Sequence, residues 1–305
     1  MQQFLLTLNT QSLLFLYIAV GFVLANARAV TPTTRKALSS LTVNVLVPCS
    51  IFASFDQQIA GDQIGSALLI IAVASVVLLL SALLGRLLYR RRPHDRQSVL
   101  RYSTVVSNAT FAGLPVMELT YGPLGVFYAA IFSIPITTYI WSAGRTLFSP
   151  QTGFWNKVRS VVLHPCVIAV LLGLARMLLR PAIPALLNRA IAGLGACAAP
   201  ISLLFIGCVL GSIDLRAIFD RDIVLLCFVR LLALPALIWL LLLPFSLDPV
   251  AKATAVILIG MPVGATTAIL ADTYDCDVAL ASKAVFWTTL LSLVTIPLLT
   301  LLINL

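Results

Sequence analysis

Long apolar stretches alternate with short polar connections from one end of this chain to the other. A helix needs about 20 apolar residues to cross a bilayer, and stretches of roughly that length recur throughout. We expect ten membrane helices, at residues 11–27, 37–55, 64–88, 99–119, 124–147, 160–179, 190–211, 222–244, 252–271 and 281–304. The connections between these ranges are too short for a soluble domain. The pattern therefore predicts an all-α polytopic membrane protein.

Composition and charge support a membrane location and predict an orientation. Of the 305 residues, 60% are hydrophobic and 10% are charged, whereas soluble domains are about 45–50% apolar. The net charge of +9 would also suit a nucleic-acid-binding protein, but fifteen lysines and arginines fall in alternate connections and four in the others. This asymmetry follows the positive-inside rule. We expect the lipid bilayer and not nucleic acid as a partner, in the cell (inner) membrane, with both termini outside on the periplasmic side.

The first apolar stretch could be mistaken for a signal peptide because Ala25-Asn26-Ala27 resembles a cleavage site. A signal peptide carries its positive charge before the apolar stretch. Here no basic residue precedes the stretch, and Arg28 follows it. We expect this segment to be retained as the first helix.

The cysteines do not indicate a redox or metal site. The six cysteines are Cys49, Cys166, Cys197, Cys208, Cys227 and Cys276. They form no CxxC pair and no zinc spacing, and five of them lie in apolar helices. A free cysteine in such a helix behaves as a small hydrophobic residue. We expect no bound metal and no cofactor.

Two apolar stretches, one in each half, contain nearly the same tetrapeptide. These are Gly113-Leu114-Pro115-Val116 and Gly260-Met261-Pro262-Val263. A proline inside a helix removes a backbone hydrogen bond, and in a bilayer the freed groups need protein or a water-filled cavity as partners. Matching interruptions in corresponding helices are typical of the substrate site of a secondary transporter. The alternative is that Pro115 and Pro262 are simple kinks that pack against neighbouring helices.

Three short motifs recur in the same order in the two halves, which indicates a duplication. Their offsets are 152, 147 and 153 residues, and the pairs are Pro48-Cys49-Ser50 with Pro200-Ile201-Ser202, the two tetrapeptides above, and Thr120-Tyr121-Gly122 with Thr273-Tyr274-Asp275. Five helices in each half mean that the second repeat enters the membrane from the opposite side. We expect a first repeat at residues 1–148, a short cytoplasmic linker at 149–159 and an inverted second repeat at 160–305.

The ordered set of motifs resembles the auxin efflux carrier family, which includes the plant PIN proteins and bacterial malonate-transporter-like carriers. The resemblance covers nearly the whole chain and is carried by Asn108 with Gly113-Leu-Pro115, Pro262-Val263-Gly264, Ala271-Asp272-Thr273-Tyr274, Ser282-Lys283, His164-Pro165 and Arg230 with Pro235. Plant PIN proteins have a second proline where this chain has Thr267, and many have a long central loop that is lacking here. Both departures favour a bacterial-type member.

The resemblance implies the fold of sodium/proton antiporters and bile-acid carriers, with elevator-type alternating access. Helices within about 11–55 and 160–211 would form a scaffold, often dimeric through helices 1, 2, 6 and 7. Helices within about 64–147 and 222–304 would form a mobile transport domain. In that domain the broken helices 4 and 9 would cross.

The predicted breaks suit a small organic anion, such as malonate, another carboxylate or an auxin-like acid. A helix that restarts in the membrane exposes N–H groups and about half a positive elementary charge. The surrounding residues are neutral, and no Arg or Lys lies deep in helices 4 and 9. We expect the site to include Asn108, Thr110, Gly113, Pro115, Pro262, Gly264, Thr266 and Thr267. Alternatively, Asn108 only bonds a neighbouring helix, and the glycines serve helix packing.

Three further polar residues within the predicted helices are candidate functional residues, because a polar side chain inside a membrane is costly and usually has a function. Asn44 either packs in the scaffold or contacts substrate. Glu118 is expected near the outer surface and could bind a coupling proton or sodium ion. Arg230 could snorkel to the cytoplasmic face, pair with a carboxylate such as Asp272, or take part in coupling. The sequence does not identify the coupling ion.

Other functional classes fit less well. An intramembrane enzyme is disfavoured because Tyr274-Asp275 has no Gly-x-Gly-Asp counterpart, there is no HExxH, and His94 and His164 lie far apart in the sequence. A receptor or regulatory protein of the same fold would need longer cytoplasmic loops. A channel and a cation-coupled symporter of the bile-acid type are the remaining alternatives.

Overall fold

The computed structural model describes residues 2–56, 61–144, 146–148, 158–159, 162–211, 220–264 and 266–303. Within these ranges the ordered elements are helices, and the only extended pairing is one isolated antiparallel bridge between Ser107 and Val263. The predicted all-α class is therefore confirmed. By length and composition, six helices of the described residues could cross a membrane: Thr33–Ser54, Gly65–Leu88, Ala109–Gly144, Ala185–Cys208, Arg221–Leu242 and Val278–Ile303.

Helices lie within all ten ranges expected from the sequence. The first half contains α1 (Gln2–Asn26), α2 (Pro32–Leu41), η1 (Thr42–Leu46), α3 (Val47–Ser54), α4 (Gly61–Leu88), α5 (His94–Val105), η2 (Ala109–Gly113), α6 (Leu114–Tyr139) and η3 (Ile140–Gly144). The second half contains α8 (Pro165–Leu179), α9 (Ala185–Ala196), α10 (Ala198–Leu210), α11 (Arg221–Phe228), η4 (Val229–Ala233), α12 (Leu234–Leu242), α13 (Pro249–Ile259), α14 (Thr266–Thr273) and α15 (Val278–Ile303). The predicted linker at 149–159 falls mostly outside the described residues.

Three intrahelical prolines are accommodated by π turns. The turns η1, η2 and η4 each end two residues before a proline, at Pro48, Pro115 and Pro235. In each case the residue just before the proline bonds five residues back, as Leu114 N–H does to the carbonyl of Ala109. The wider turn relieves the contact between the proline ring and the preceding turn. The prediction of a break at Pro115 is therefore wrong: the helix continues through Pro115, and the break lies upstream at residues 106–108.

A sharp kink at Gly122 divides the long helix α6. Gly122 has φ +61° and ψ −150°, a conformation that is open essentially to glycine alone. After Gly122 the chain folds back on the preceding turns. The close approach is seen at Gly125, where an added Cβ would lie 2.5 Å from the carbonyl oxygen of Met117. The kink falls between the two helices that the sequence predicted at 99–119 and 124–147.

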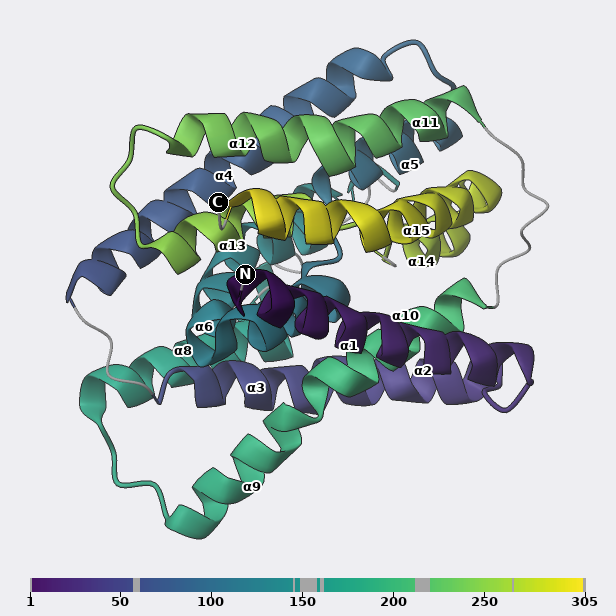
Figure 1. The fold of residues 1–305 in the computed structure, drawn as a ribbon. Helices are drawn as coiled ribbons and strands as arrows, with labels where there is room; N and C mark the ends of the chain where they lie inside the picture. Colours follow the sequence, from purple (N-terminus) through teal and green to yellow (C-terminus); the bar gives the residue numbers. More distant parts are fainter. Residues whose placement is uncertain are drawn as a thin grey trace.

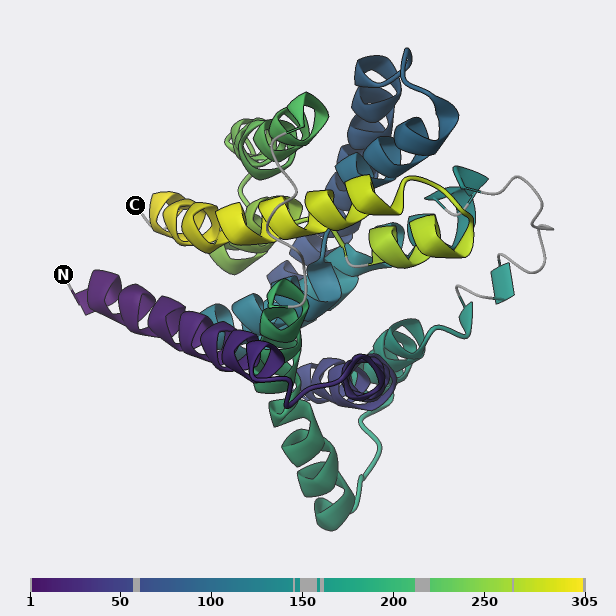
Figure 2. The same ribbon diagram turned by 90° about the vertical axis from the view of Figure 1, so that its right-hand side faces the viewer.

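The helices pack in two groups, seen in the lower and upper parts of Figure 1 and again in Figure 2. In the first group α1 packs along α10, and α3 packs against α8 and α9, with α2 and η1 beside them. The second group consists of α4, α5, α6 and α11 to α15. Helix α6 lies between the groups and also contacts α3 and α10. The N- and C-termini lie near each other in both views.

The closest helix contact in the first group is made by glycines. A Cβ added to Gly21 of α1 would lie 2.0 Å from the carbonyl oxygen of Leu204. A Cβ added to Gly207 of α10 would lie 2.0 Å from that of Ile18. The two backbones therefore touch, as they do in membrane helix pairs that use small residues.

Each of the two groups contains its own cluster of ion pairs. In the first group Arg176 of α8 pairs with Asp56, donates to Asn188 of α9 at 3.0 Å and lies 5.0 Å from the centre of the Phe52 ring. In the second group Arg92 and Arg96, before and within α5, pair with acidic residues at the starts of α11 and α15, namely Asp220, Asp222 and Asp277. The second cluster includes residues of the segment 86–101, which carries six of the twenty lysines and arginines.

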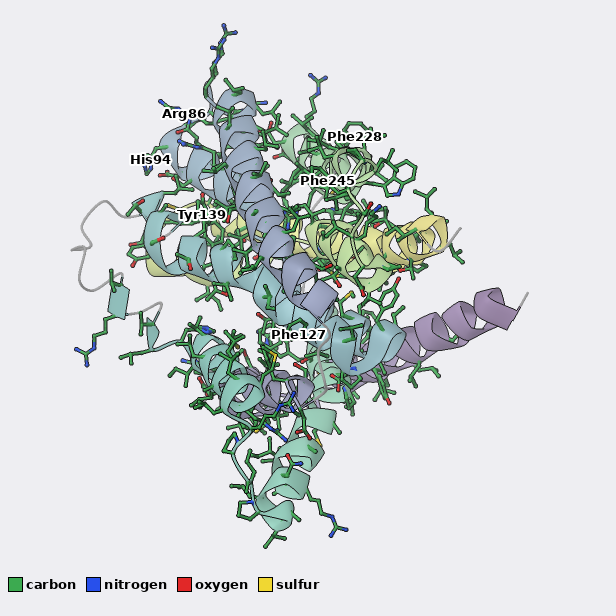
Figure 3. The ribbon with its side chains drawn as sticks, turned by 90° about the vertical axis from the view of Figure 1, so that its left-hand side faces the viewer. Arg86, His94, Phe127, Tyr139, Phe228 and Phe245 are labelled. Carbon is green, nitrogen blue, oxygen red and sulfur yellow. The ribbon has the colours of Figure 1, made fainter. Side chains whose placement is uncertain are left out.

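Figure 3 places these features relative to the surface. Arg86 and His94 lie at the end of the molecule where α4 passes into α5, and Phe127 lies near its centre. Phe228 and Phe245 lie along the α11–α12 side, with 56% and 48% of their surfaces exposed. Large apolar side chains that are exposed on helices of this kind suit a lipid-facing surface.

Candidate functional site

The breaks in the two interrupted helices pair with each other. The first break separates α5 from η2, and the second separates α13 from α14. Asn108 donates its N–H to the carbonyl of Pro262 at 2.8 Å, and Gly264 donates to the carbonyl of Val106 at 3.2 Å. We refer to residues 104–113, 259–264 and 266–267 as the crossover. Pairing satisfies the backbone groups that each break exposes, which a membrane interior requires.

Asn108 caps the helix that restarts after the first break. Its Oδ1 accepts the N–H of Phe111 at 3.3 Å, and its carbonyl accepts the N–H groups of Ala112 and Gly113 at 3.0 Å. This is the arrangement that makes asparagine a favoured N-cap. The residue is 7% exposed, and its Nδ2 amino group has no partner in the part of the chain that the structure describes. Asn108 therefore keeps an amino group with two N–H donors after it caps the helix.

The predicted glycines allow close packing at the crossover. A Cβ on Gly113 would lie 2.4 Å from the Cδ2 atom of Leu258 in α13. A Cβ on Gly264 would meet Val106 at 3.2 Å and Thr266 at 3.3 Å. Both glycines therefore lie in close contact with neighbouring residues. This fits helix packing, the alternative role that the sequence left open. Pro115 is buried but lies seven residues beyond Asn108, away from the break.

The predicted threonines have three different environments. Thr266 Oγ1 lies 3.1 Å from the hydroxyl of Tyr102, which joins α14 to α5. Thr267 is fully buried, and its Oγ1 has no partner among the described residues. Thr110 borders a small space beside Cys166 of α8, on the first-group side of η2. Only the first two lie at the paired breaks.

Arg230 enters the crossover from the neighbouring helix. It is fully buried in η4. Its Nε donates to the carbonyl of Met261 at 3.1 Å, and its Nη1 donates to those of Thr104 at 2.8 Å and Val105 at 3.2 Å. The expectation that Arg230 snorkels to the surface is wrong, because the carbonyls that end two interrupted helices provide acceptors inside the protein. The side chain of Asp272, the other expected partner, lies outside the described residues. The crossover therefore contains a cation, and this cation comes from η4 and not from either of the two interrupted helices.

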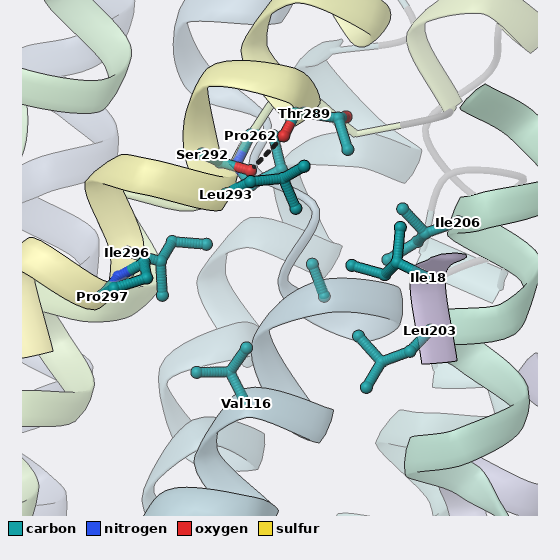
Figure 4. Close-up of a pocket in the computed structure, with 11 residues that line it drawn as sticks. Ile18, Val116, Leu203, Ile206, Pro262, Thr289, Ser292, Leu293, Ile296 and Pro297 are labelled. Carbon is teal, nitrogen blue, oxygen red and sulfur yellow. Dashed lines mark hydrogen bonds between the residues drawn. The ribbon is translucent and has the colours of Figure 1, made fainter. Parts of the chain in front are cut away.

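A small cavity adjoins the crossover where the two helix groups meet (Figure 4). Its volume is about 40 Å³, room for roughly three waters. The second group contributes Pro262, Ala112, Val116 and residues of α15 that include Thr289 and Ser292, whereas α1 and α10 contribute Ile18, Leu203 and Ile206. The walls are mostly apolar, and Ser292 donates to the carbonyl of Thr289 at 2.7 Å. The volume matches a carboxylate group more closely than a large ligand.

A family model described as "Membrane transport protein" matches residues 10–300. The chain belongs to this family. It is also 27% identical over 297 residues to an uncharacterized transporter of Methanothermobacter thermautotrophicus, with 95% of this chain and 97% of that protein covered. The family resemblance drawn from the motifs is thereby confirmed, and the chain is a multi-pass membrane protein of a transporter family.

Two of the secondary candidates lie away from the crossover of this family member. Asn44 is exposed, and its Nδ2 donates to Ser40 Oγ one turn back in the same helix at 3.1 Å. The side chain of Asn44 therefore bonds its own helix and not the crossover. Glu118 is half-buried and accepts from Ser50 Oγ of α3 at 3.4 Å. It therefore links α6 to the first group.

Sequence reasoning missed some groups that shape the site of this membrane transport protein. Thr288 of α15 accepts the N–H of Val263 at 3.0 Å and so holds the second break in place. Ser107 is 4% exposed, and its hydroxyl has no partner among the described residues. Ser107 lies beside the motif residue Asn108, which is the one sequence signal that pointed to it. Thr288 lies in an unbroken apolar helix and carried no signal.

Proposed function

We propose that this protein is a secondary transporter for small organic anions and that the carboxylate of its substrate binds at the crossover. The class includes malonate, other small mono- or dicarboxylates and auxin-like acids. The observation that carries the proposal is the pairing of Asn108 with Pro262 and of Gly264 with Val106. This pairing brings the starts of two helices, at Ala109 and Thr266, to one place.

The chemistry of these helix starts supports an anion. The first N–H groups of a helix have no acceptor within it, which applies to Ala109, Thr110 and Thr266. The aligned peptide dipoles add about half a positive elementary charge at each start. An ionised carboxylate offers only acceptors, so it complements these groups and the free Nδ2 of Asn108. Backbone donors hold a carboxylate without the strong ion pair that would slow its release.

The packing supports elevator-type movement. The first group, within the predicted scaffold ranges 11–55 and 160–211, would stay fixed, whereas the second group, within 64–147 and 222–304, would carry the crossover across the membrane. The cavity beside Pro262 lies on the boundary between the groups. The walls of this cavity are apolar on both sides, with Ile18 on the first group and Val116 on the second, which favours sliding of one group past the other.

The remaining features of the proposal concern assembly and orientation. We propose two inverted five-helix repeats in the inner membrane with both termini outside. The proximity of the termini in both views is compatible with this (Figures 1 and 2). A homodimer through the first, second, sixth and seventh predicted helices (11–27, 37–55, 160–179 and 190–211) would leave the second group free to move. The coupling ion, a proton or sodium, is left open.

Ligand-induced thermal stabilisation of the purified protein tests the proposal. A panel of small mono- and dicarboxylates, including malonate, is compared on wild type, Asn108→Ala and Asn26→Ala. Asn26 is a matched control because it is exposed at the end of α1 and, among the described residues, bonds the carbonyl of Phe22 in its own helix. We expect at least one carboxylate to stabilise wild type and Asn26→Ala and to lose this effect in Asn108→Ala.

The other outcomes have distinct meanings. Stabilisation that survives in Asn108→Ala would keep a carboxylate carrier but remove the site from the crossover. A panel without any stabilising carboxylate would contradict the proposed substrate class. Stabilisation without transport would favour a receptor of the same fold.

A further inference from the structure

Arg230 is a buried charge without a carboxylate partner in the described part of the chain. It is completely buried, and its three hydrogen bonds end on the main-chain carbonyls of Met261, Thr104 and Val105. The ion pairs among the described residues do not include it. A guanidinium stays protonated in proteins. The crossover therefore carries one complete positive charge.

The acceptors of Arg230 are the ends of two different helices. Thr104 and Val105 are the last residues of α5, and Met261 follows the end of α13. The free carbonyls at the end of a helix carry about half a negative elementary charge. A single side chain from η4 thus caps both interrupted helices, one from each half of the protein.

The charges at the crossover add up to an excess of one. Two helix starts bring about half a positive charge each, and two helix ends bring about half a negative charge each, so the four termini cancel. Arg230 adds one positive charge. The described crossover residues include no Asp or Glu. The site therefore has a net charge of about one positive elementary charge when no ligand is bound.

We propose that Arg230 sets this charge and thereby makes the crossover select anions with a single negative charge. The inference deepens the proposed function and rests on it, because it assumes that the carboxylate binds at the crossover. One bound carboxylate neutralises the site. A second carboxylate on the same ligand brings a charge with no counter-charge into a low-dielectric region, where an uncompensated charge is costly.

Unpartnered donors at the crossover provide an independent reason to expect an acceptor. Three buried groups there have no hydrogen-bond partner among the described residues: Nη2 of Arg230, Oγ of Ser107 and Oγ1 of Thr267. Buried polar groups are nearly always bonded in proteins. All three can donate, and a carboxylate can only accept. A carboxylate is therefore the kind of acceptor that these donors lack, and its charge is opposite to that of the site.

Ligand pairs that differ by one charge test this selectivity. Binding of malonate and its monoamide, and of succinate and its monoamide, is measured on wild type at pH 8 by thermal stabilisation titrations. Each monoamide has almost the shape of its diacid but one charge fewer. We expect each monoamide to bind at least as tightly as its diacid. A diacid that binds tenfold more tightly than its monoamide overturns the charge assignment but leaves the proposed function standing, whereas no binding by any member of the pairs overturns both.

Variants of Arg230 separate the charge from the packing. Arg230→Lys keeps the charge with fewer donors, Arg230→Gln keeps one donor and removes the charge, and Arg189→Gln is the control at an exposed arginine of α9. We expect at least tenfold weaker binding of the monoamides in Arg230→Gln, and binding within threefold of wild type in the other two. A purely structural role would lower the affinity for diacid and monoamide equally. Folded Arg230→Gln that binds the monoamides within threefold of wild type overturns the proposal. If Arg230→Gln does not fold, the ratio of diacid affinity to monoamide affinity in wild type and in Arg230→Lys decides whether the proposal stands.

Discussion

Arg230 Nη1 and the carbonyl oxygen of Thr104 lie 2.8 Å apart although 126 residues separate them in the chain. The bond joins the π turn η4 of the second half to the end of α5 in the first half. Together with the bond from Arg230 to Met261, it ties three helices to one side chain. The crossover is therefore held by a cation that neither broken helix contains.

Replacement of Arg230 by methionine should destabilise the protein strongly. The change leaves the carbonyls of Thr104, Val105 and Met261 without their donor, and each buried group that loses its partner costs about 1–3 kcal/mol. We expect a loss of about 3 kcal/mol or more in detergent, measured by thermal unfolding. Arg189→Met, at an exposed position, should unfold close to wild type. Equal unfolding temperatures for Arg230→Met and wild type would show that these bonds do not hold the crossover.

Gly122 is expected to resist even a small side chain. Its φ of +61° with ψ of −150° is costly for any residue with a Cβ, by about 1–3 kcal/mol, although no atom lies within 4 Å of an added Cβ. Gly122→Ala should therefore be destabilised through the backbone alone. Gly193→Ala in α9 is the matched control, since its Cβ also meets nothing and alanine favours a helix. The idea fails if both variants unfold at the wild-type temperature.

The contact between α1 and α10 should also be sensitive to a glycine-to-alanine substitution, here because of steric overlap between the two helices. A Cβ at position 207 would lie 2.0 Å from the carbonyl oxygen of Ile18, so Gly207→Ala must push the helices apart. Overpacking of this kind typically costs about 1–3 kcal/mol. Chemical or thermal unfolding of Gly207→Ala, again beside Gly193→Ala, measures the effect. Unchanged stability would mean that α1 and α10 lie further apart than described.

The ion-pair cluster around Arg96 predicts a particular response to acid. Burial alone would raise the pKa of the Asp220 carboxyl, but the hydrogen bonds from Arg96, 2.5 Å away, and from the N–H of Asp222 outweigh burial and lower the pKa from its ordinary 3.8. A carboxyl with a lowered folded pKa stabilises the protein above its unfolded pKa, and the contribution is lost as pH falls through the folded value.

The acid response can be measured with one substitution. Asp220→Asn should unfold at a lower temperature than wild type, and the difference should be constant from pH 7 to pH 5. The lost ion pair should lower the free energy of unfolding by about 1 kcal/mol. The difference should shrink below about pH 4 as Asp220 of wild type becomes protonated. Asp95→Asn, at an exposed carboxyl that is 67% accessible, serves as the control. A difference that grows on acidification contradicts this assignment.

Much of the fold follows from the apolar pattern, because segment length and hydropathy decide where helices form. The second break was also predictable, since Gly260, Pro262 and Gly264 interrupt one helix within a few residues. The first break was misplaced because the same kind of motif at Gly113 and Pro115 is absorbed by the π turn η2. A π turn depends on packing around the helix and leaves no separate mark in the sequence.

The candidate site was predictable only in part. Asn108, Gly264 and Thr266 were expected near the breaks and lie at them. The role of Arg230 was not predictable, because the depth of a residue in a helix does not tell which way its side chain turns. That direction depends on η4 and on the carbonyls of α5 and α13, which come together only in the folded chain.

The central claim is that the crossover binds a small carboxylate and carries it between the two sides of a membrane. Counterflow in proteoliposomes tests it most directly, with vesicles preloaded with the carboxylate that stabilises the purified protein and diluted into a trace of the labelled compound. The account predicts saturable, transient accumulation of label in vesicles with wild type or Asn26→Ala, and at least a tenfold lower initial rate with Asn108→Ala at equal reconstitution. Failure of wild type to accumulate label, with binding intact, would contradict the account.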